Sequence, residues 1–487
     1  MNNGRHFRRV LVTALVAGAP LLGLAPGTAS ASTGPVVSGP VTGGNGAVVL
    51  QSTAFDLAGV GYQQSEFFVS GTAASYAPSA PLGSDGRWQV TPAGAAPYTT
   101  RLVVDRPADP AAFNGTVVVE WLNVSAGLDV APEWVSLHTE LIREGYAWVG
   151  VSAQAVGVAA DKTADPVRYA SLSHPGDSYS YDIYSQAGQV VRDQAATVLG
   201  ELRPRVVLAE GESQSAFRLT TYINAIQPLT NVYDGFLVHS RAGNGAALSQ
   251  APQADVPTPQ VVQLRTDLTA PVLTVETETD LMTLGYLAAR QPDTRRFRLW
   301  ELAGTAHADY YIATLGMVDD GSGAIGVRAF DSMLDPPTGT VNFTCGQPIN
   351  TGQMHYSMNA AQAALNRWAT LEVPPPAAPR LQVDVSGAAP AFVLDASGNV
   401  LGGVRTPAVD VPVAALSGLG QTGSQFCFLF GTTTPLPAAT LARLYPTHAR
   451  FVTRWSADTA SLTVTGFLRP ADAKELIAAA KQSGVGS

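Results

Sequence analysis

Ser213 lies in a segment whose residue types could turn its hydroxyl group into a nucleophile. The apolar run Val206–Ala209 predicts a buried strand, and Gln214–Ile226 has the periodicity of a helix. A serine in the tight turn between such elements needs small residues two positions before and after it, because strand and helix approach closely there. Gly211 and Ser215 meet this requirement, although a second glycine is more common in place of Ser215. The segment therefore predicts a nucleophile elbow at Ser213.

A second segment, Gly176–Ser180, fits the same five-residue pattern around Ser178. It follows His174 and Pro175, and no buried strand is expected before it. Because the elbow requires a strand, a turn and a helix in that order, the sequence favours Ser213 over Ser178 as the nucleophile.

A serine nucleophile needs an orienting acid and a base, which in this arrangement follow it in that order along the chain. The expected strand Val272–Val275 runs into several acids, of which we predict Asp280 as the triad acid and keep Glu278 as the alternative. Of the seven histidines, only His307 lies on a glycine-containing loop directly after the next expected strand, Phe297–Glu301. His307 is therefore the predicted base.

The same chemistry needs backbone N–H groups that stabilise an oxyanion. One is expected from Gln214, at the start of the helix after the nucleophile. The other should come from the loop after the expected strand Thr116–Trp121, at Leu122 or Asn123. The side chain of Asn123 could instead cap that turn.

Strands and helices alternate through the middle of the chain, which predicts βαβ units and a mostly parallel sheet with helices on both faces. Two β-type runs before this region predict an antiparallel pair. The expected strands are Glu66–Ser70, Thr99–Val104, Thr116–Trp121, Ala147–Ser152, Val206–Ala209, Gly235–His239, Val272–Val275, Phe297–Glu301 and Ser461–Thr465. The expected helices are Pro132–Arg143, Tyr181–Leu199, Gln214–Ile226, Leu281–Arg290, Met358–Trp368 and Ala471–Lys481. The fold class is therefore α/β.

The N-terminal residues have the composition of an export signal: several arginines, an apolar stretch over 10–25, and the small-residue site Ala29–Ala31. The apolar stretch is shorter than the roughly 20 residues that a membrane span needs. We therefore expect a secreted protein, cleaved after Ala31, without a membrane anchor. The expected organisation is a signal peptide over 1–31, a flexible leader over 32–53, an α/β core over 54–373, and a C-terminal elaboration over 374–487 packed on the core.

The chain has two cysteines, Cys345 and Cys427, which we expect to form a disulfide in an oxidising compartment. Two buried free thiols are the alternative. Composition excludes other classes: 46% of the 487 residues are hydrophobic and 14% are charged, which favours a globular protein over a disordered one. The formal net charge is -9 and no basic run occurs, so no nucleic-acid partner is expected.

The long connection from Ala155 to Tyr184, with a hairpin near Asn399, is the predicted wall of an acyl pocket. Ligands of open α/β sheets bind at the carboxyl edge of the strands, and this connection leaves the sheet at that edge. Its tyrosines, which include Tyr179 and Tyr181, would form a partly apolar lining.

Several spaced motifs together resemble a bacterial and fungal family known as the alpha/beta hydrolase domain family. The motifs are VEWLNVSAGLD (119–129), HPGDSYSYDIYSQAGQ (174–189), GESQSA (211–216), TETD (277–280), GTAH (304–307) and DASGNVLGGVRTPAVDVP (395–412). The resemblance implies an α/β-hydrolase fold, with Ser213, an acid in the TETD segment and His307 as a catalytic triad. It names no substrate.

These observations predict a secreted serine hydrolase, with carboxylic esters of small molecules or polymers as the expected substrates. The alternatives are an amidase or peptidase with the same triad and a non-catalytic binding or surface module on a hydrolase scaffold. The sequence has no cysteine cluster or HExxH motif for a metal and no glycine-rich strand-to-helix fingerprint, so no metal or cofactor is expected.

Overall fold

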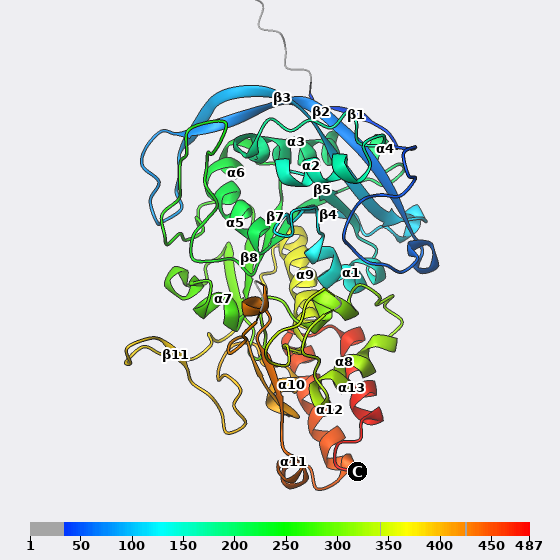
Figure 1. The fold of residues 1–487 in the computed structure, drawn as a ribbon, viewed down its shortest axis with the longest axis vertical. Helices are drawn as coiled ribbons and strands as arrows, with labels where there is room; N and C mark the ends of the chain where they lie inside the picture. The colour runs from blue at the N-terminus through cyan, green and yellow to red at the C-terminus, as the bar shows by residue number, and fades with distance from the viewer. Residues whose placement is uncertain (1–33, 341, 424–425) are drawn as a thin grey trace, which may run out of the picture. The chain divides into compact units, whose positions relative to one another are not determined.

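A nine-stranded mixed sheet organises the described residues of this computed structural model, which are 34–340, 342–423 and 426–487 (Figure 1). The strand order is β1-β2-β3-β5-β4-β6-β7-β8-β9. The first three strands and the β3–β5 pair are antiparallel, and the remaining pairs are parallel. The bounds are β1 (Val36–Ser38), β2 (Tyr62–Pro78), β3 (Val90–Pro107), β4 (Thr116–Trp121), β5 (Ala147–Val151), β6 (Val206–Glu212), β7 (Gly235–His239), β8 (Val272–Glu276) and β9 (Phe297–Glu301).

The parallel part of the sheet is buried on both faces, as its continuous apolar runs predict. Every residue of β4, β5, β6, β7 and β8 is buried. On one face Leu208 and Leu237 pack in a cluster with α1 (Pro132–Arg143) and α9 (Met354–Leu371). On the other face Val207 and Phe236 pack with α3 (Ser180–Asp193) and α5 (Gln214–Thr221). The predicted α/β class is confirmed, and the site at the strand ends rests on a rigid layer.

Shorter elements complete the described chain. The other helices are α2 (Ala155–Ala164), α4 (Ala195–Val198), α6 (Gln227–Thr230), α7 (Glu278–Met282), α8 (Ala324–Leu334), α10 (Pro407–Asp410), α11 (Ala438–Leu444), α12 (His448–Thr465) and α13 (Pro470–Gln482). Two small antiparallel pairs are β10 (Val383–Asp384) with β11 (Ala391–Phe392), and β12 (Ala414–Ser417) with β13 (Thr432–Pro435). A π-helical turn over Tyr222–Ile226 continues α5.

Some predicted elements differ from the structure in detail. The helix expected over Leu281–Arg290 begins earlier, because Thr277 caps α7, which ends at Met282. A separate 3₁₀ turn over Tyr286–Ala289 follows Gly285, whose φ is 75°. The long loop expected after Ala155 contains α2. Within the leader predicted over 32–53, β1 pairs with β2 at the sheet edge. The predicted signal peptide lies outside the described residues.

The strand expected over Ser461–Thr465 is helical, as the last turn of α12. The segment ends in three consecutive β-branched residues, Thr463, Val464 and Thr465, which favour a strand locally. Core packing outweighs that preference, because Trp455 and Thr459 of the same helix are fully buried. Within the helix, the hydroxyl groups of Thr463 and Thr465 donate to carbonyls four residues earlier.

Three helices of the C-terminal half pack against one face of the sheet. Phe330 of α8, Trp455 of α12 and Leu476 of α13 belong to the same buried cluster as one face of the sheet, and Figure 1 shows the three helices together. A disulfide joins Cys345 to Cys427, whose Cα atoms lie 5.6 Å apart. Residues Pro35–Ser487 form one compact unit, while the limits proposed for the core and the elaboration stay predictions.

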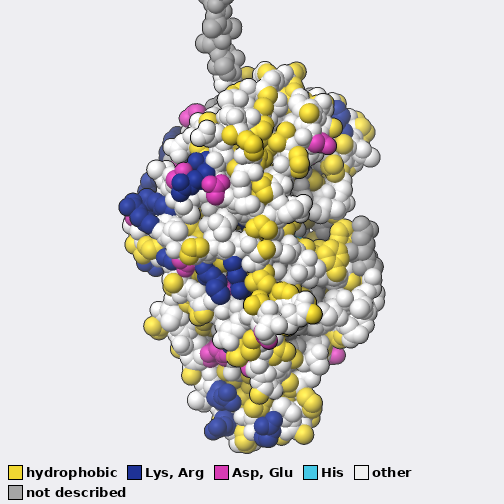
Figure 2. Space-filling model, turned by 90° about the vertical axis from the view of Figure 1, so that its left-hand side faces the viewer, with side chains coloured by type: hydrophobic (Ala, Val, Ile, Leu, Met, Phe, Trp, Pro, Cys, Tyr) yellow, Lys and Arg dark blue, Asp and Glu magenta, His cyan; other side chains and the backbone are white. Residues whose placement is uncertain are grey.

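The described surface is mixed in charge on the face drawn in Figure 2. There, Lys and Arg side chains lie in small separate groups, several of them next to Asp and Glu side chains. Within the described residues, no helix combines the length and the apolar character needed to cross a membrane.

The disulfide should contribute measurably to stability, because it closes a loop of 82 residues in the unfolded chain. Reduction should lower the free energy of unfolding by about 4 kcal/mol in the chain-entropy view, measured by denaturant titration with and without reductant. A Cys345→Ala/Cys427→Ala variant should not respond to reductant. Two free thiols in the denatured, unreduced protein would contradict the bridge.

Candidate active site

Ser213 occupies a strained turn between β6 and α5. Its φ of 59° and ψ of -120° lie in a region that a non-glycine residue rarely adopts. The backbone N–H of Ser213 donates to the carbonyl of His239 at the end of β7, over 3.0 Å. The neighbouring strand therefore holds the turn in place, and the serine hydroxyl is presented at the carboxyl edge of the sheet.

The small residues around the serine serve the close approach that the sequence predicts. A Cβ atom built on Gly211 would lie 3.0 Å from Cβ of Ser215 and 3.2 Å from Cδ1 of Leu219. Even one added methyl group would therefore push α5 away from β6, and with it the turn that carries Ser213.

The structure brings the three predicted triad residues together. The Oγ of Ser213 lies 2.7 Å from Nε2 of His307, and Nδ1 of His307 lies 2.7 Å from Oδ1 of Asp280. The His307 side chain is buried, with 2% of its surface exposed. The imidazole is thus held between a hydroxyl that can donate a proton to Nε2 and a carboxylate that accepts from Nδ1.

The geometry also separates the two candidate acids. The Oδ2 of Asp280 accepts from the backbone and the hydroxyl of Thr277, each over 2.7 Å, which leaves Oδ1 for His307. The carboxylate of Glu278 instead accepts from two backbone N–H groups, those of Gly304 and Gly418. Burial raises the pKa of Glu278 to about 7. Glu278 thus connects two loops, and Asp280 is the acid in contact with the histidine.

Glu212, which sequence reasoning did not single out, is a second carboxylate beside the histidine. Its Oε1 lies 3.4 Å from Nε2 of His307, and burial raises the pKa of Glu212 to about 7. For His307, burial lowers the pKa, but the carboxylates of Asp280 and Glu212 outweigh this effect, so the pKa is raised above its usual value. The position between the elbow glycine and the serine was the available sequence signal.

The expected second oxyanion donor is corrected by the structure. The backbone N–H of Leu122 donates to Val151, and that of Asn123 donates to Val130, so neither is available to a substrate. The Asn123 side chain donates to the carbonyl of Glu212 and accepts from the N–H of Ser125. Asn123 therefore has the turn-capping role that was the alternative.

Gln214 is the first residue of α5, directly after Ser213, where the sequence predicts an oxyanion donor. Its backbone N–H stands in the first turn of α5, where helical N–H groups have no acceptor within the helix. Its side chain donates to that of Gln154, the residue directly before α2, over 2.9 Å. This contact fixes the start of the helix behind the serine.

The second elbow-like segment, around Ser178, is buried and has a structural role. The Oγ of Ser178 accepts from the N–H of Gln250 and donates to its carbonyl, and the side chain is fully buried. Tyr179 and Tyr181 are also buried, with their hydroxyl groups bonded to Gln253 and Ala247. The segment thus supports the core and does not line the cavity at Ser213, which corrects the predicted pocket wall.

A cavity of about 510 Å³ opens beside Ser213 and His307. Its volume is within the range of small-molecule sites. Its wall is mainly apolar, and the aromatic lining residues are Phe217, Phe343, Phe426, Phe428 and Phe430. Four of these five come from the segments on either side of the disulfide, not from the tyrosine-rich connection or the hairpin near Asn399.

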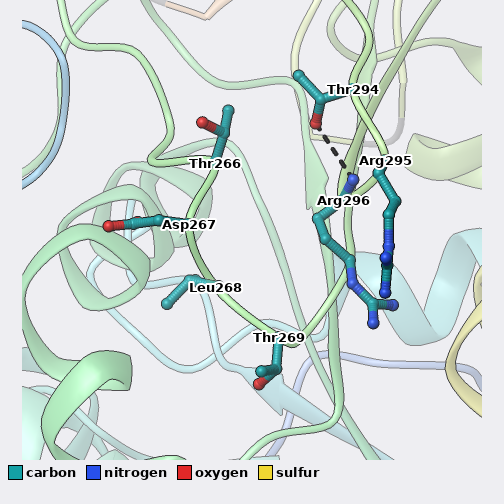
Figure 3. Close-up of a pocket in the computed structure, with 7 residues that line it drawn as sticks. All are labelled: Thr266, Asp267, Leu268, Thr269, Thr294, Arg295 and Arg296. Carbon is teal, nitrogen blue, oxygen red and sulfur yellow. Dashed lines mark hydrogen bonds between the residues drawn. The ribbon is translucent and has the colours of Figure 1, made fainter.

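A second hollow, of about 380 Å³, lies at the opposite edge of the sheet (Figure 3). It is lined by Thr266, Asp267, Leu268, Thr269, Thr294, Arg295 and Arg296. These residues precede β8 and β9, so they stand at the amino ends of parallel strands, while ligands of such sheets bind at the carboxyl ends. Its lining has neither a histidine nor a serine.

No group of three or more His, Cys, Asp or Glu side chains in the described part of the chain could hold a metal ion.

Comparison with known families matches residues 37–478 to the model of the alpha/beta hydrolase domain. The chain belongs to the alpha/beta hydrolase domain family. This match confirms the family resemblance and the α/β-hydrolase fold. The elbow and the residues after β8 and β9 all lie within the matched range. Comparison with curated proteins found no significant match.

Solved structures of the same class align over parts of the chain. A fungal esterase from Rhizomucor miehei is 10% identical, with a TM-score of 0.30, over 62% of this chain and 85% of its own. A carboxylesterase from Lactobacillus plantarum is 10% identical, with a TM-score of 0.26, over 44% and 78%. A thermostable esterase from Pseudomonas putida is 14% identical, with a TM-score of 0.25, over 46% and 66%.

The two acids should respond differently to neutral replacement. Asp280→Asn should lower kcat on the order of 10⁴-fold, because the amide no longer holds His307 in the tautomer that accepts from serine. Glu278→Gln should mainly lower the melting temperature, because it disturbs the hydrogen bonds to Gly304 and Gly418. Its loss in kcat should be much smaller than that of Asp280→Asn. Kinetics and thermal melts of both variants decide this. A larger kcat loss in Glu278→Gln would reverse the assignment.

The pH dependence of kcat/KM should depend on the carboxylate of Glu212. Only neutral His307 can act as base, so kcat/KM should fall as the pH drops through the raised pKa of His307. Glu212→Gln removes one of the charges that raise that pKa, so the acid limb should move to lower pH. Glu278→Gln is the matched control and should leave the limb in place. An unmoved limb in Glu212→Gln would contradict the coupling.

Proposed function

We propose that this protein is a secreted serine hydrolase that cleaves carboxylic esters through an acyl-enzyme. The observation that supports this most strongly is the hydrogen-bonded series of Ser213, His307 and Asp280, with the serine on a strained turn at the carboxyl edge of the sheet.

Each residue has a defined part in the proposed reaction. The Oγ of Ser213 attacks the carbonyl carbon while its proton passes to Nε2 of His307. The imidazolium then gives this proton to the leaving alcohol as the ester C–O bond breaks. Asp280 accepts from Nδ1 throughout and stabilises the positive charge on the ring. The backbone N–H of Gln214 is the donor that we assign to the developing oxyanion.

Water completes the cycle. It attacks the acyl carbon while its proton passes to Nε2 of His307, and the histidine returns a proton to Ser213 as the carboxylic acid leaves. The cavity beside the two side chains has room for an acyl or alcohol group next to this water.

Export is the second part of the proposal. It rests on the arginine-rich, apolar N-terminal segment with its small-residue cleavage site at Ala29–Ala31. The disulfide between Cys345 and Cys427 agrees with an oxidising compartment.

Ser213→Ala should remove ester hydrolysis and leave the fold intact, because the substitution deletes one oxygen at a partly exposed turn. The expected loss in kcat with p-nitrophenyl acetate is on the order of 10³-fold or more. Ser178→Ala is the matched control, since Ser178 lies in the second elbow-like segment, and it should retain turnover. Near-normal activity in Ser213→Ala would refute the proposed nucleophile.

A further inference from the structure

Three phenylalanines near the disulfide form one side of the cavity, and we name Phe343, Phe426 and Phe428 the phenylalanine wall. Phe343 precedes Cys345 by two residues, and Phe426 and Phe428 flank Cys427. The disulfide therefore joins the two segments of the wall at its base, although they are far apart in the sequence.

Neighbouring contacts hold this wall against the triad. The Phe343 ring packs edge-on to Phe430, with centroids 4.8 Å apart. The backbone N–H of Ala308, next to His307, donates to the carbonyl of Leu429 over 3.0 Å. These contacts connect Phe343, through Phe430, and the segment that carries Phe428 to the histidine loop, as the support of a specificity surface requires.

The wall leaves apolar surface uncovered. Phe426 is 40% exposed and Phe428 is 47% exposed, while both line the cavity. A ligand that covers such apolar surface binds more tightly. Each methylene of the ligand that becomes buried raises the affinity about fourfold. The exposed faces of these rings are therefore available to an apolar group bound next to Ser213.

The charge of the cavity lining also favours an apolar ligand. Among the described residues that line the cavity there is neither lysine nor arginine, and the acidic one is Glu212, beside His307. An anionic substrate would find no cationic partner and would face this carboxylate. The lining suits a neutral, apolar group.

We propose that the phenylalanine wall makes this protein selective for neutral esters that carry a bulky apolar group, aryl or medium-chain alkyl, over acetate-sized ones. This inference rests on the proposed function and adds the substrate class. The disulfide, on this account, maintains the selectivity by keeping the two segments of the wall together.

The test measures kcat/KM in two series with the full-length protein. One varies the acyl group of p-nitrophenyl esters from acetate to octanoate and benzoate. The other series varies the alcohol of acetate esters from ethyl to hexyl and benzyl. Hydrolysis of these esters is measured by the release of protons. In at least one series kcat/KM should rise by up to about fourfold per methylene until the cavity is filled.

Substitutions then locate the origin of the gain. Phe428→Ala and Phe343→Ala should lower the ratio of kcat/KM for the best ester to that for the smallest by about tenfold or more. Phe428→Leu should lower it less, and it covers the case in which an alanine variant fails to fold. Reduction of the disulfide should also lower the ratio. Phe392→Ala, on β11 outside the cavity, is the control and should leave ratio and activity unchanged.

The outcomes separate this inference from the function on which it rests. If the smallest esters are cleaved but neither series shows a gain, or the gain survives in the wall variants, the wall does not select the substrate and the proposed function stands. If no ester is cleaved and a fluorophosphonate does not label Ser213, the proposed function fails and the inference fails with it.

Discussion

The hydrogen bond between His307 and Asp280 depends on the four residues that follow β8, and each of them makes a different contact. Thr277 caps α7 and holds Oδ2 of Asp280. Glu278 accepts from two glycines on separate loops. The Thr279 hydroxyl accepts from the backbone N–H of His307 and donates to the carbonyl of Gly418. One short segment therefore positions the acid, the histidine loop and the C-terminal region together, so that the 2.7 Å contact is the result of several coupled constraints.

These contacts make the C-terminal region part of the site. Gly418 is bonded to Glu278 and Thr279, and a Cβ atom on Gly418 would lie 2.6 Å from Cβ of Glu278, so only glycine allows this approach. Leu429 accepts from Ala308 directly after the histidine. The same region supplies most of the aromatic lining of the cavity. It thus both supports the histidine loop and forms the surface next to it. Gly418 and Leu429 lie within residues 37–478, which the family model matches.

Local patterns were sufficient to predict the parallel core and to single out Ser213 and His307 at its edge. A buried parallel strand is a continuous apolar run, and the elbow needs small residues at fixed offsets, so both can be recognised without tertiary information. The choice between Asp280 and Glu278 could not be made in this way, because it depends on where a turn of α7 directs each carboxylate. The expected donor at Asn123 failed for a similar reason, since its N–H is used by Val130, seven residues away.

The cavity wall was missed because it is built from segments brought together by tertiary contacts. The tyrosines at 179 and 181 were attractive from composition, yet their rings are buried and their hydroxyl groups are bonded inside the core. The residues that face the cavity flank two cysteines whose sequence separation is 82. The predicted bridge was the one sequence signal that could have brought Phe343 and Phe428 together in advance.

Trapping the covalent intermediate tests the central claim most directly. After reaction with a fluorophosphonate, proteolysis and mass spectrometry should find the adduct on the peptide that contains Ser213, and Asp280→Asn should slow its formation, because the serine hydroxyl then lacks its oriented base. An adduct on any other serine, or no adduct in a folded protein that cleaves esters, would contradict the account.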